Sequence, residues 1–175
     1  GVTVRVADEA GAAVAIGETG DLQVKGPNVF PGYWRMPERT AEDFSANGFF
    51  NTGDKATIDA DGYVSIVGRA KDMVITGGLN VYPKEIELVI DDMKGVKESA
   101  VIGVPHADFG EAVIAVIVPD SADLDTGVPT AEEIITHCKT QLADFKAPKR
   151  VEVIDTLPRN AMGKVQKNRL REQYS

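Results

Sequence analysis

One lysine near the end of the chain has a setting that could do chemistry. Lys164 directly follows Gly163, in a loop that begins at Pro158. Proline fixes its own φ and glycine allows conformations that other residues avoid, so we expect a loop that is rigid at its start and loose at its end. The ammonium group on such a loop is a mobile point charge suited to a carboxylate or a phosphate. A solvated lysine after an ordinary turn has the same local pattern.

An aspartate in the first half of the chain offers a complementary group. Asp54 follows Thr52-Gly53, a pair typical of a turn, and it would present its carboxylate at a loop tip. The two acceptor oxygens of that carboxylate suit a vicinal diol such as the one in ribose. The alternative is an aspartate that only stabilises its own turn.

Two further groups of residues lie near the middle of the chain. The cluster 68–72 contains Arg69 and Lys71, and by itself it is typical of a solvated linker. Gly77-Gly78 precedes a predicted helix, where two glycines let another molecule approach the backbone closely. This pair fits neither the dinucleotide-binding nor the P-loop pattern, and its alternative is a flexible turn. We find no metal-ligand spacing, and we expect His106 to be structural or solvated.

The elements that must position these residues change in type near residues 68–71. The predicted strands are 2–6, 21–26, 55–58, 63–67, 72–76, 96–104, 112–118 and 151–154, and the predicted helices are 38–44, 83–93, 130–142 and 167–173. Thr130 with Glu133 predicts a capping box. Tyr33 and Trp34 are expected to pack against the β-rich part. The pattern predicts an α+β fold with a β-rich segment over 1–68 and a small α+β domain over 69–175.

Composition and charge exclude several classes of protein. The chain has 175 residues and a net charge of −8, which argues against non-specific nucleic-acid binding. Residues 144–171 nevertheless contain eight basic and three acidic residues, which predicts a solvated face or attraction for a small polyanion. We find no apolar run long enough to span a membrane and no signal peptide. The single cysteine, Cys138, is predicted to be buried, and the composition suits the cytoplasm.

The order and spacing of these groups together resemble the C-terminal part of the adenylate-forming acyl-CoA synthetase superfamily. The matching motifs are Gly32-Tyr33-Trp34 with Pro37-Glu38 and Thr40, Thr52-Gly53-Asp54, Gly68-Arg69 with Lys71-Asp72, Gly77-Gly78 with Asn80 and residues 83–87, and Pro158-Arg159 with Gly163-Lys164. The ending 157–168 is most similar to malonyl-CoA synthetases. The chain starts at Gly1 rather than at methionine, so we expect it to be cut from a longer protein.

The resemblance implies a reaction in two halves that uses ATP and coenzyme A. A carboxylate, with malonate favoured, attacks the α-phosphate to give an acyl-adenylate, and the thiol of coenzyme A then displaces AMP. Asp54 matches the aspartate that holds the ribose hydroxyls, and Arg69 matches the arginine that supports the same nucleotide. Lys164 matches the lysine that bridges carboxylate and phosphate oxygens in the first half-reaction.

The resemblance also implies a moving lid. Lys71 falls at the hinge between a large N-terminal domain and the mobile C-terminal lid domain, although many relatives have aspartate there. Gly77-Gly78 would line the pantetheine tunnel after the lid turns. Residues 1–68 would be the last piece of the N-terminal domain, the partner that supplies the phosphate loop, the Mg²⁺-ligating glutamate and most of the acyl pocket. We therefore expect the chain alone to be inactive.

Two other hypotheses remain open at this point. One is an adenylation domain that loads a carrier protein instead of free coenzyme A, since the late motifs are nearly shared. The other is a non-catalytic regulatory surface whose Lys164 is acetylated by a protein acetyltransferase, a change that removes the lysine charge.

Overall fold

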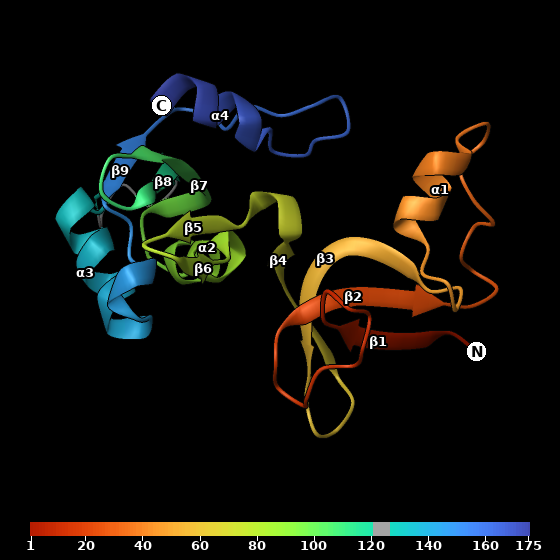
Figure 1. The fold of residues 1–175 in the computed structure, drawn as a ribbon. Coiled ribbons are helices and arrows are strands. Elements are labelled where there is room, and N and C mark those ends of the chain that lie inside the picture. The colour runs from red at the N-terminus through yellow and green to blue at the C-terminus, as the bar shows by residue number, and fades with distance from the viewer. Residues whose placement is uncertain (121–126) are drawn as a thin grey trace. The chain divides into compact units, whose positions relative to one another are not determined.

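The computed structural model describes residues 1–120 and 127–175, and the chain divides into two compact units (Figure 1). The first unit is Gly1–Lys71 and the second is Asp72–Ser175. The division falls after Lys71, at the end of the stretch 68–71 where the sequence pattern changes and three residues after the predicted end of the β-rich segment at Gly68. The chain contains two sheets, in which the strands pair antiparallel except for β8 and β9, together with helices, and this confirms the predicted α+β class.

The first unit is an antiparallel sheet with one short helix. Its strands are β1 (Thr3–Ala7), β2 (Gly20–Lys25), β3 (Phe50–Ile58) and β4 (Val64–Arg69), and they pair in chain order. The helix α1 (Pro37–Asp43) begins with a proline at its first turn, a position where the missing N–H costs no hydrogen bond. The buried core of this unit is small and consists of Val6, Leu22 and Ala56.

The second unit is a five-stranded sheet covered by helices. Its elements are β5 (Val74–Thr76), β6 (Leu79–Val81), α2 (Pro83–Asp91), β7 (Val96–His106), β8 (Gly110–Pro119), α3 (Ala131–Gln141), β9 (Arg150–Val153) and α4 (Lys167–Tyr174), with a short 3₁₀ turn at Asp144–Lys146. A second 3₁₀ turn, Ala70–Asp72, spans the division between the two units. β8 pairs along one edge with β7, and its other edge is shared by β5 and the parallel strand β9. The sequence pattern missed β6, which is only three residues long.

The central parts of β7 (100–104) and β8 (112–118) are apolar and buried, as expected where both faces of a sheet are covered. Successive side chains in a strand point to opposite faces, so alternate residues enter two different cores. Val101 and Val113 pack with Ile86, Ile90 and Ile134 of α2 and α3. Ile102 and Ile114 pack with Leu157 and Leu170, the latter from α4. The helices α2 and α3 therefore lie on one face of the sheet and α4 on the other (Figure 1).

The predicted capping box at the start of α3 is confirmed. The Thr130 hydroxyl accepts the Glu133 N–H at 3.3 Å, and the Glu133 carboxylate accepts the Thr130 N–H at 2.7 Å. The hydrogen bonds that the Thr130 N–H and the Thr130 hydroxyl donate to this carboxylate lower the pKa of Glu133, since they favour its ionised form. Two otherwise unpaired donors at the helix start are thereby satisfied by residues close together in the sequence.

Cys138 should resist thiol reagents while the chain is folded. It is fully buried in α3, and burial raises the pKa of its thiol from 9.0 to about 11. Because the thiolate is the reactive form, this shift alone lowers the reactive fraction at pH 8 by about 100-fold. We expect labelling by iodoacetamide, followed by mass spectrometry, to be slow in buffer and fast in denaturant. Equal rates in both would contradict the burial of Cys138.

Candidate functional site

Asp54 and Arg69 form an ion pair within the first unit. They are register partners on β3 and β4, and Arg69 Nε lies 2.7 Å from Asp54 Oδ1. The Asp54 side chain is 19% exposed and the Arg69 side chain is 51% exposed. The pair uses one carboxylate oxygen, and a carboxylate has acceptor capacity on both oxygens. The structure thus brings two predicted site residues together, with a fixed cation holding the orientation of the carboxylate.

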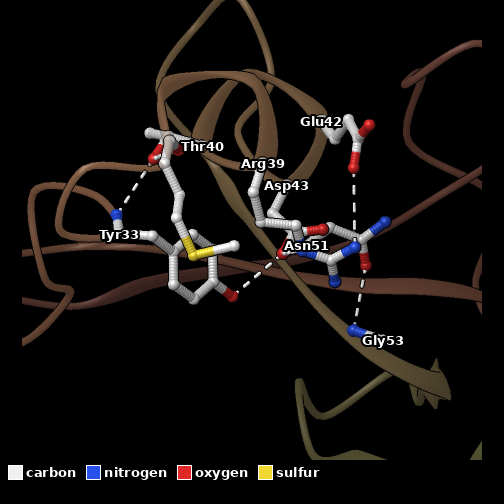
Figure 2. A network of polar contacts seen from close by, with 8 residues as sticks. Tyr33, Arg39, Thr40, Glu42, Asp43, Asn51 and Gly53 are labelled. Carbon is white, nitrogen blue, oxygen red and sulfur yellow. Dashed lines mark hydrogen bonds and ion pairs between the residues drawn. The ribbon is translucent and has the colours of Figure 1, made fainter.

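The turn expected at Thr52-Gly53-Asp54 is a bulge inside one strand, so the prediction of a loop tip is wrong. β3 runs unbroken over Phe50–Ile58, and its pairing with β2 shifts register at this point. Gly53 makes the bulge possible because its φ is 74°. The Thr52 hydroxyl accepts the Asp54 N–H at 3.1 Å and donates to the Leu22 carbonyl at 2.9 Å. Asn51 Oδ1 accepts the Gly53 N–H at 3.1 Å (Figure 2), so side chains replace the interrupted ladder.

A polar network joins α1 to the loop before it, and sequence reasoning missed it (Figure 2). The Tyr33 hydroxyl donates to Asp43 Oδ2 at 2.9 Å, and Arg39 Nε lies 3.0 Å from the same oxygen. The hydrogen bond to Asp43 raises the pKa of Tyr33, and the charge of Asp43 raises the pKa of Arg39. The Tyr33 N–H also donates to the Thr40 hydroxyl at 2.9 Å. The resemblance names Tyr33 and Thr40: the bond to Asp43 uses the tyrosine hydroxyl, and the bond from the Tyr33 N–H uses the threonine hydroxyl.

The expectation that Trp34 packs against the β-rich unit is wrong, because its side chain is 84% exposed. The aromatic cluster of this unit centres on Phe30 instead, whose ring lies 4.9 Å from Tyr33 and 5.2 Å from Phe50. Arg35, which follows Trp34, has a φ of 55°, and this left-handed conformation turns the chain directly after the tryptophan. The Arg35 guanidinium lies 5.6 Å from the centre of the Trp34 ring.

Lys71 is exposed and is the last residue of the first unit. It lies in the 3₁₀ turn Ala70–Asp72, directly after β4. Asp72 opens the second unit and pairs with Arg171 of α4 at 3.3 Å. The structure therefore places Lys71 where the two units join along the chain, and its hinge role stays a prediction.

Gly77 and Gly78 are the two central residues of a tight hairpin in the second unit. They join β5 to β6, with Thr76 and Leu79 as register partners on either side. Their φ values are 57° and 78°. Positive φ at both central residues defines the hairpin turn whose twist matches that of the strands, and glycine meets this demand without strain. The glycine pair therefore has a structural reason, in addition to the predicted role beside pantetheine.

Lys164 is exposed and belongs to the same unit as the glycine hairpin. It lies in a second hairpin, between Pro158 and Gln166, with a bridge between Arg159 and Val165. Gly163 has a φ of 78°, as its position in the turn requires. The expectation of a loose end to this loop is wrong, because hydrogen bonds hold both its strands.

The basic residues near the end of the chain are largely paired with acids. The ion pairs are Lys146–Glu85, Arg150–Glu152, Arg159–Glu98, Lys167–Glu87 and Arg171–Asp72. Lys149, Lys164 and Arg169 take part in no ion pair within the described part of the chain. The attraction for a polyanion is therefore weaker than the residue count predicts, and Lys164 is one of a few unpaired cations here.

Other site types find no support in the described residues. Across residues 1–120 and 127–175, no group of three or more His, Cys, Asp and Glu side chains is placed to hold a metal ion. In the same ranges, no helix has the length and apolar character needed to cross a bilayer. His106 has a structural role, since its Nδ1 accepts the Asp108 N–H at 3.2 Å and its ring lies 4.9 Å from that of Phe109. Two hollows beside α3, the larger of about 690 Å³, are lined by no predicted site residue.

Comparison with known proteins identifies one domain and a set of relatives. Residues 85–164 match the family described as the AMP-binding enzyme C-terminal domain. A long-chain-fatty-acid–CoA ligase of Yersinia pestis is 45% identical over 170 residues, covering 97% of this chain and 29% of the relative. A feruloyl-CoA synthase of an Amycolatopsis species is 44% identical over 172 residues, covering 98% of this chain and 34% of the relative.

A solved structure is similar to this chain in both fold and sequence. The crystal structure of ATP-bound MatB from Rhodopseudomonas palustris has a TM-score of 0.90 and 58% sequence identity, covering 99% of this chain and 34% of MatB. The chain thus spans about a third of the length of the relatives that it matches.

Replacing Gly78 by alanine should destabilise the β5–β6 hairpin by about 1–2 kcal/mol, because a left-handed conformation is costly for a residue with a Cβ. Nothing lies within 4 Å of a Cβ at this position, so the backbone alone causes the loss. Gly78→Asn should recover most of the stability, since asparagine tolerates this conformation. Amide hydrogen exchange of β5 and β6 measures the effect. A Gly78→Ala variant as well protected as the parent would contradict the assigned turn.

Proposed function

We propose that the chain is the C-terminal part of an ATP-dependent, AMP-forming carboxylic acid–CoA ligase, because residues 85–164 match the AMP-binding enzyme C-terminal domain. The relatives named above that are CoA ligases or synthases support this class. The observation that carries the proposal is Lys164, an exposed ammonium group that forms no ion pair in residues 1–120 and 127–175 and that lies in a hydrogen-bonded hairpin. An enzyme that joins two anions needs such a cation.

The proposed reaction has two steps, adenylation of the acid and transfer of the acyl group to coenzyme A. In the first step a carboxylate oxygen of the acid bonds to the α-phosphorus of ATP, and the bond to the β-phosphate oxygen breaks, releasing pyrophosphate. In the second step the sulfur of coenzyme A bonds to the acyl carbon and its thiol proton goes to solvent, while the bond between the acyl carbon and the phosphate oxygen breaks, releasing AMP. Lys164 acts in the first step, where its charge offsets the repulsion between carboxylate and phosphate oxygens as charge builds on the α-phosphate.

Asp54 and Arg69 are the proposed nucleotide-binding residues. The Asp54 carboxylate would accept hydrogen bonds from the ribose hydroxyls while Arg69 holds its orientation across the 2.7 Å ion pair. The bulge at Thr52 to Asp54 fixes the backbone beneath this carboxylate. A preset carboxylate binds a diol with less loss of side-chain freedom than a mobile one.

The remaining assignments follow the same proposal. Lys71 is the proposed hinge, since a few residues at the end of an element can absorb a large change in backbone dihedrals. After the lid turns, the Gly77-Gly78 hairpin would line the tunnel for pantetheine. The N-terminal domain of the same enzyme is the proposed partner, and it would supply the phosphate loop and the glutamate that binds Mg²⁺.

Malonate is the favoured acid, and this choice rests on the ending 157–168, which resembles malonyl-CoA synthetases. The curated relatives named above take a long-chain fatty acid and ferulate according to their names, so they support only the broader class of acyl-CoA ligases. The pocket that selects the acid would belong to the N-terminal domain.

Lys164 is also the proposed point of control by a protein acetyltransferase. Its exposure makes the ammonium group accessible, and acetylation would remove the charge that the first step needs. The second step would continue, because it does not use this group.

Lys164→Ala in the complete ligase should slow adenylation by about 100-fold or more, the usual loss when one transition-state donor is removed. The same variant should convert a preformed acyl-adenylate and coenzyme A to thioester at nearly the parent rate. Acid-dependent pyrophosphate release and thioester formation measure the two steps separately. Lys139→Ala, which removes another exposed lysine of the second unit, is the matched control and should change neither. Equal loss in both steps would contradict the role of Lys164.

The chain alone should form no acyl-CoA from ATP, malonate and coenzyme A. The proposed phosphate loop and acid pocket belong to the other domain, so the triphosphate would have too few partners. Liquid chromatography of the products tests this expectation, with the complete ligase as the positive control. Thioester formation by the isolated chain that depends on both ATP and acid would overturn it.

A further inference from the structure

The hairpin that carries Lys164 is held mainly by one residue, Asn160. The Asn160 N–H donates to the Lys164 carbonyl at 2.9 Å, and Asn160 Oδ1 accepts the Lys164 N–H at 3.0 Å. Both backbone polar groups of Lys164 are thus bound to the same residue. Asn160 Oδ1 also accepts the Met162 N–H at 3.0 Å, and its carbonyl accepts the Gly163 N–H at 2.9 Å. These four bonds fix the peptide planes on either side of Lys164.

Arg159 ties this hairpin to the sheet. Its guanidinium donates to the Gly163 carbonyl at 2.7 Å, and the other terminal nitrogen pairs with Glu98 of β7. A guanidinium presents several donors in a fixed fork, so one side chain can hold two acceptors at a set angle. The residue directly before Lys164 is therefore connected through Arg159 to a strand in the core of the second unit.

The chain is anchored again directly after the hairpin. Lys167 Nζ lies 2.6 Å from Glu87 of α2, and the two side chains are only 16% and 9% exposed. Lys164, three residues earlier, is exposed and makes no ion pair in the described ranges. Lys167 therefore anchors the chain to α2, whereas Lys164 is held by no ion pair within the described residues.

We propose that Asn160 is the positioning residue of Lys164, acting through the backbone of the hairpin with the Arg159–Glu98 pair as its anchor to the sheet. This inference rests on the proposed function, because it assumes that Lys164 acts in adenylation. All of these contacts lie within the second unit, and they set the direction in which the Lys164 side chain leaves the backbone. Misplacing a catalytic group by about 1 Å can cost up to 100-fold in rate, so loss of these bonds reaches the chemistry.

Two variants of Asn160 separate its carbonyl oxygen from the rest of the side chain. Asn160→Ala removes the acceptor for two N–H groups, whereas Asn160→Asp keeps an acceptor oxygen at the same place. Asn160→Ala in the complete ligase should lower the adenylation rate at saturating ATP and acid by about 10-fold or more, with the KM values little changed. The adenylation rate of Asn160→Asp should stay within about 3-fold of the parent rate. The control Asn168→Ala, which removes an exposed asparagine side chain of α4, should keep the parent rate.

Two readouts show whether the effect is one of positioning. In the Asn160→Ala ligase, thioester formation from a preformed acyl-adenylate should remain within about 2-fold of the parent, because a merely destabilised fold would slow both steps. In the chain itself, the Met162 and Lys164 amides should exchange faster by NMR in Asn160→Ala than in Asn160→Asp. Glu98→Gln, which removes the anchor charge at the other end, should lower adenylation in the same selective way, so the inference stays testable if Asn160→Ala misfolds.

The outcomes distinguish this inference from the function on which it rests. If Lys164→Ala abolishes adenylation while Asn160→Ala and Glu98→Gln leave it unchanged, the positioning role is wrong and the proposed function stands. Equal loss in both steps for Asn160→Ala would also overturn the positioning role. If Lys164→Ala leaves adenylation unchanged, the proposed function is wrong and the positioning role falls with it, even where the amide exchange behaves as expected.

Discussion

The arrangement of the second unit depends on one buried carboxylate, that of Glu87. A buried charge is costly unless it has partners, and Glu87 is 7% exposed. Its Oε1 accepts the Val101 N–H of β7 at 2.9 Å and the Lys167 ammonium of α4 at 2.6 Å. Two consecutive elements, α2 and β7, and the distant helix α4 therefore meet at this carboxylate. Since α4 begins at Lys167, the same pair anchors the chain directly after the Lys164 hairpin.

The acids of α2 and the cations near the end of the chain form one system. Glu85, two residues before Glu87, binds Lys146 at 2.7 Å, so α2 holds both the segment after α3 and the start of α4. The ion pairs between these acids and the basic residues of 144–171 thus stabilise the packing of the second unit. Of the basic residues in 144–171, Lys149, Lys164 and Arg169 take part in no ion pair in the described ranges, and Lys164 lies in a hydrogen-bonded hairpin.

Local patterns were predictable from the sequence, and contacts between distant residues were not. The capping box of Thr130 and Glu133 spans three residues, so its chemistry is visible in the sequence. Glu87 and Lys167 are eighty positions apart, and no local pattern indicates which of many acids each cation meets. Glycine marks both turns and bulges, so the sequence predicts a turn at Gly53, and only the pairing of β2 with β3 identifies a bulge there. Asn160 did carry a signal, since asparagine side chains often bind the backbone two residues on.

The ion pairs that hold the second unit together begin at the residue directly after the proposed hinge. Asp72 follows Lys71 and binds Arg171 of α4, while Lys167 of the same helix binds Glu87. A change of backbone dihedrals at Lys71 would therefore act on a residue already connected to the helix that follows Lys164. Because the hairpin is joined to β7 on its other side, through Arg159, it has no independent hinge of its own. The lysine would then travel with the sheet and helices as one body, and the pairing of buried charges is what makes a movement at a few residues reach it.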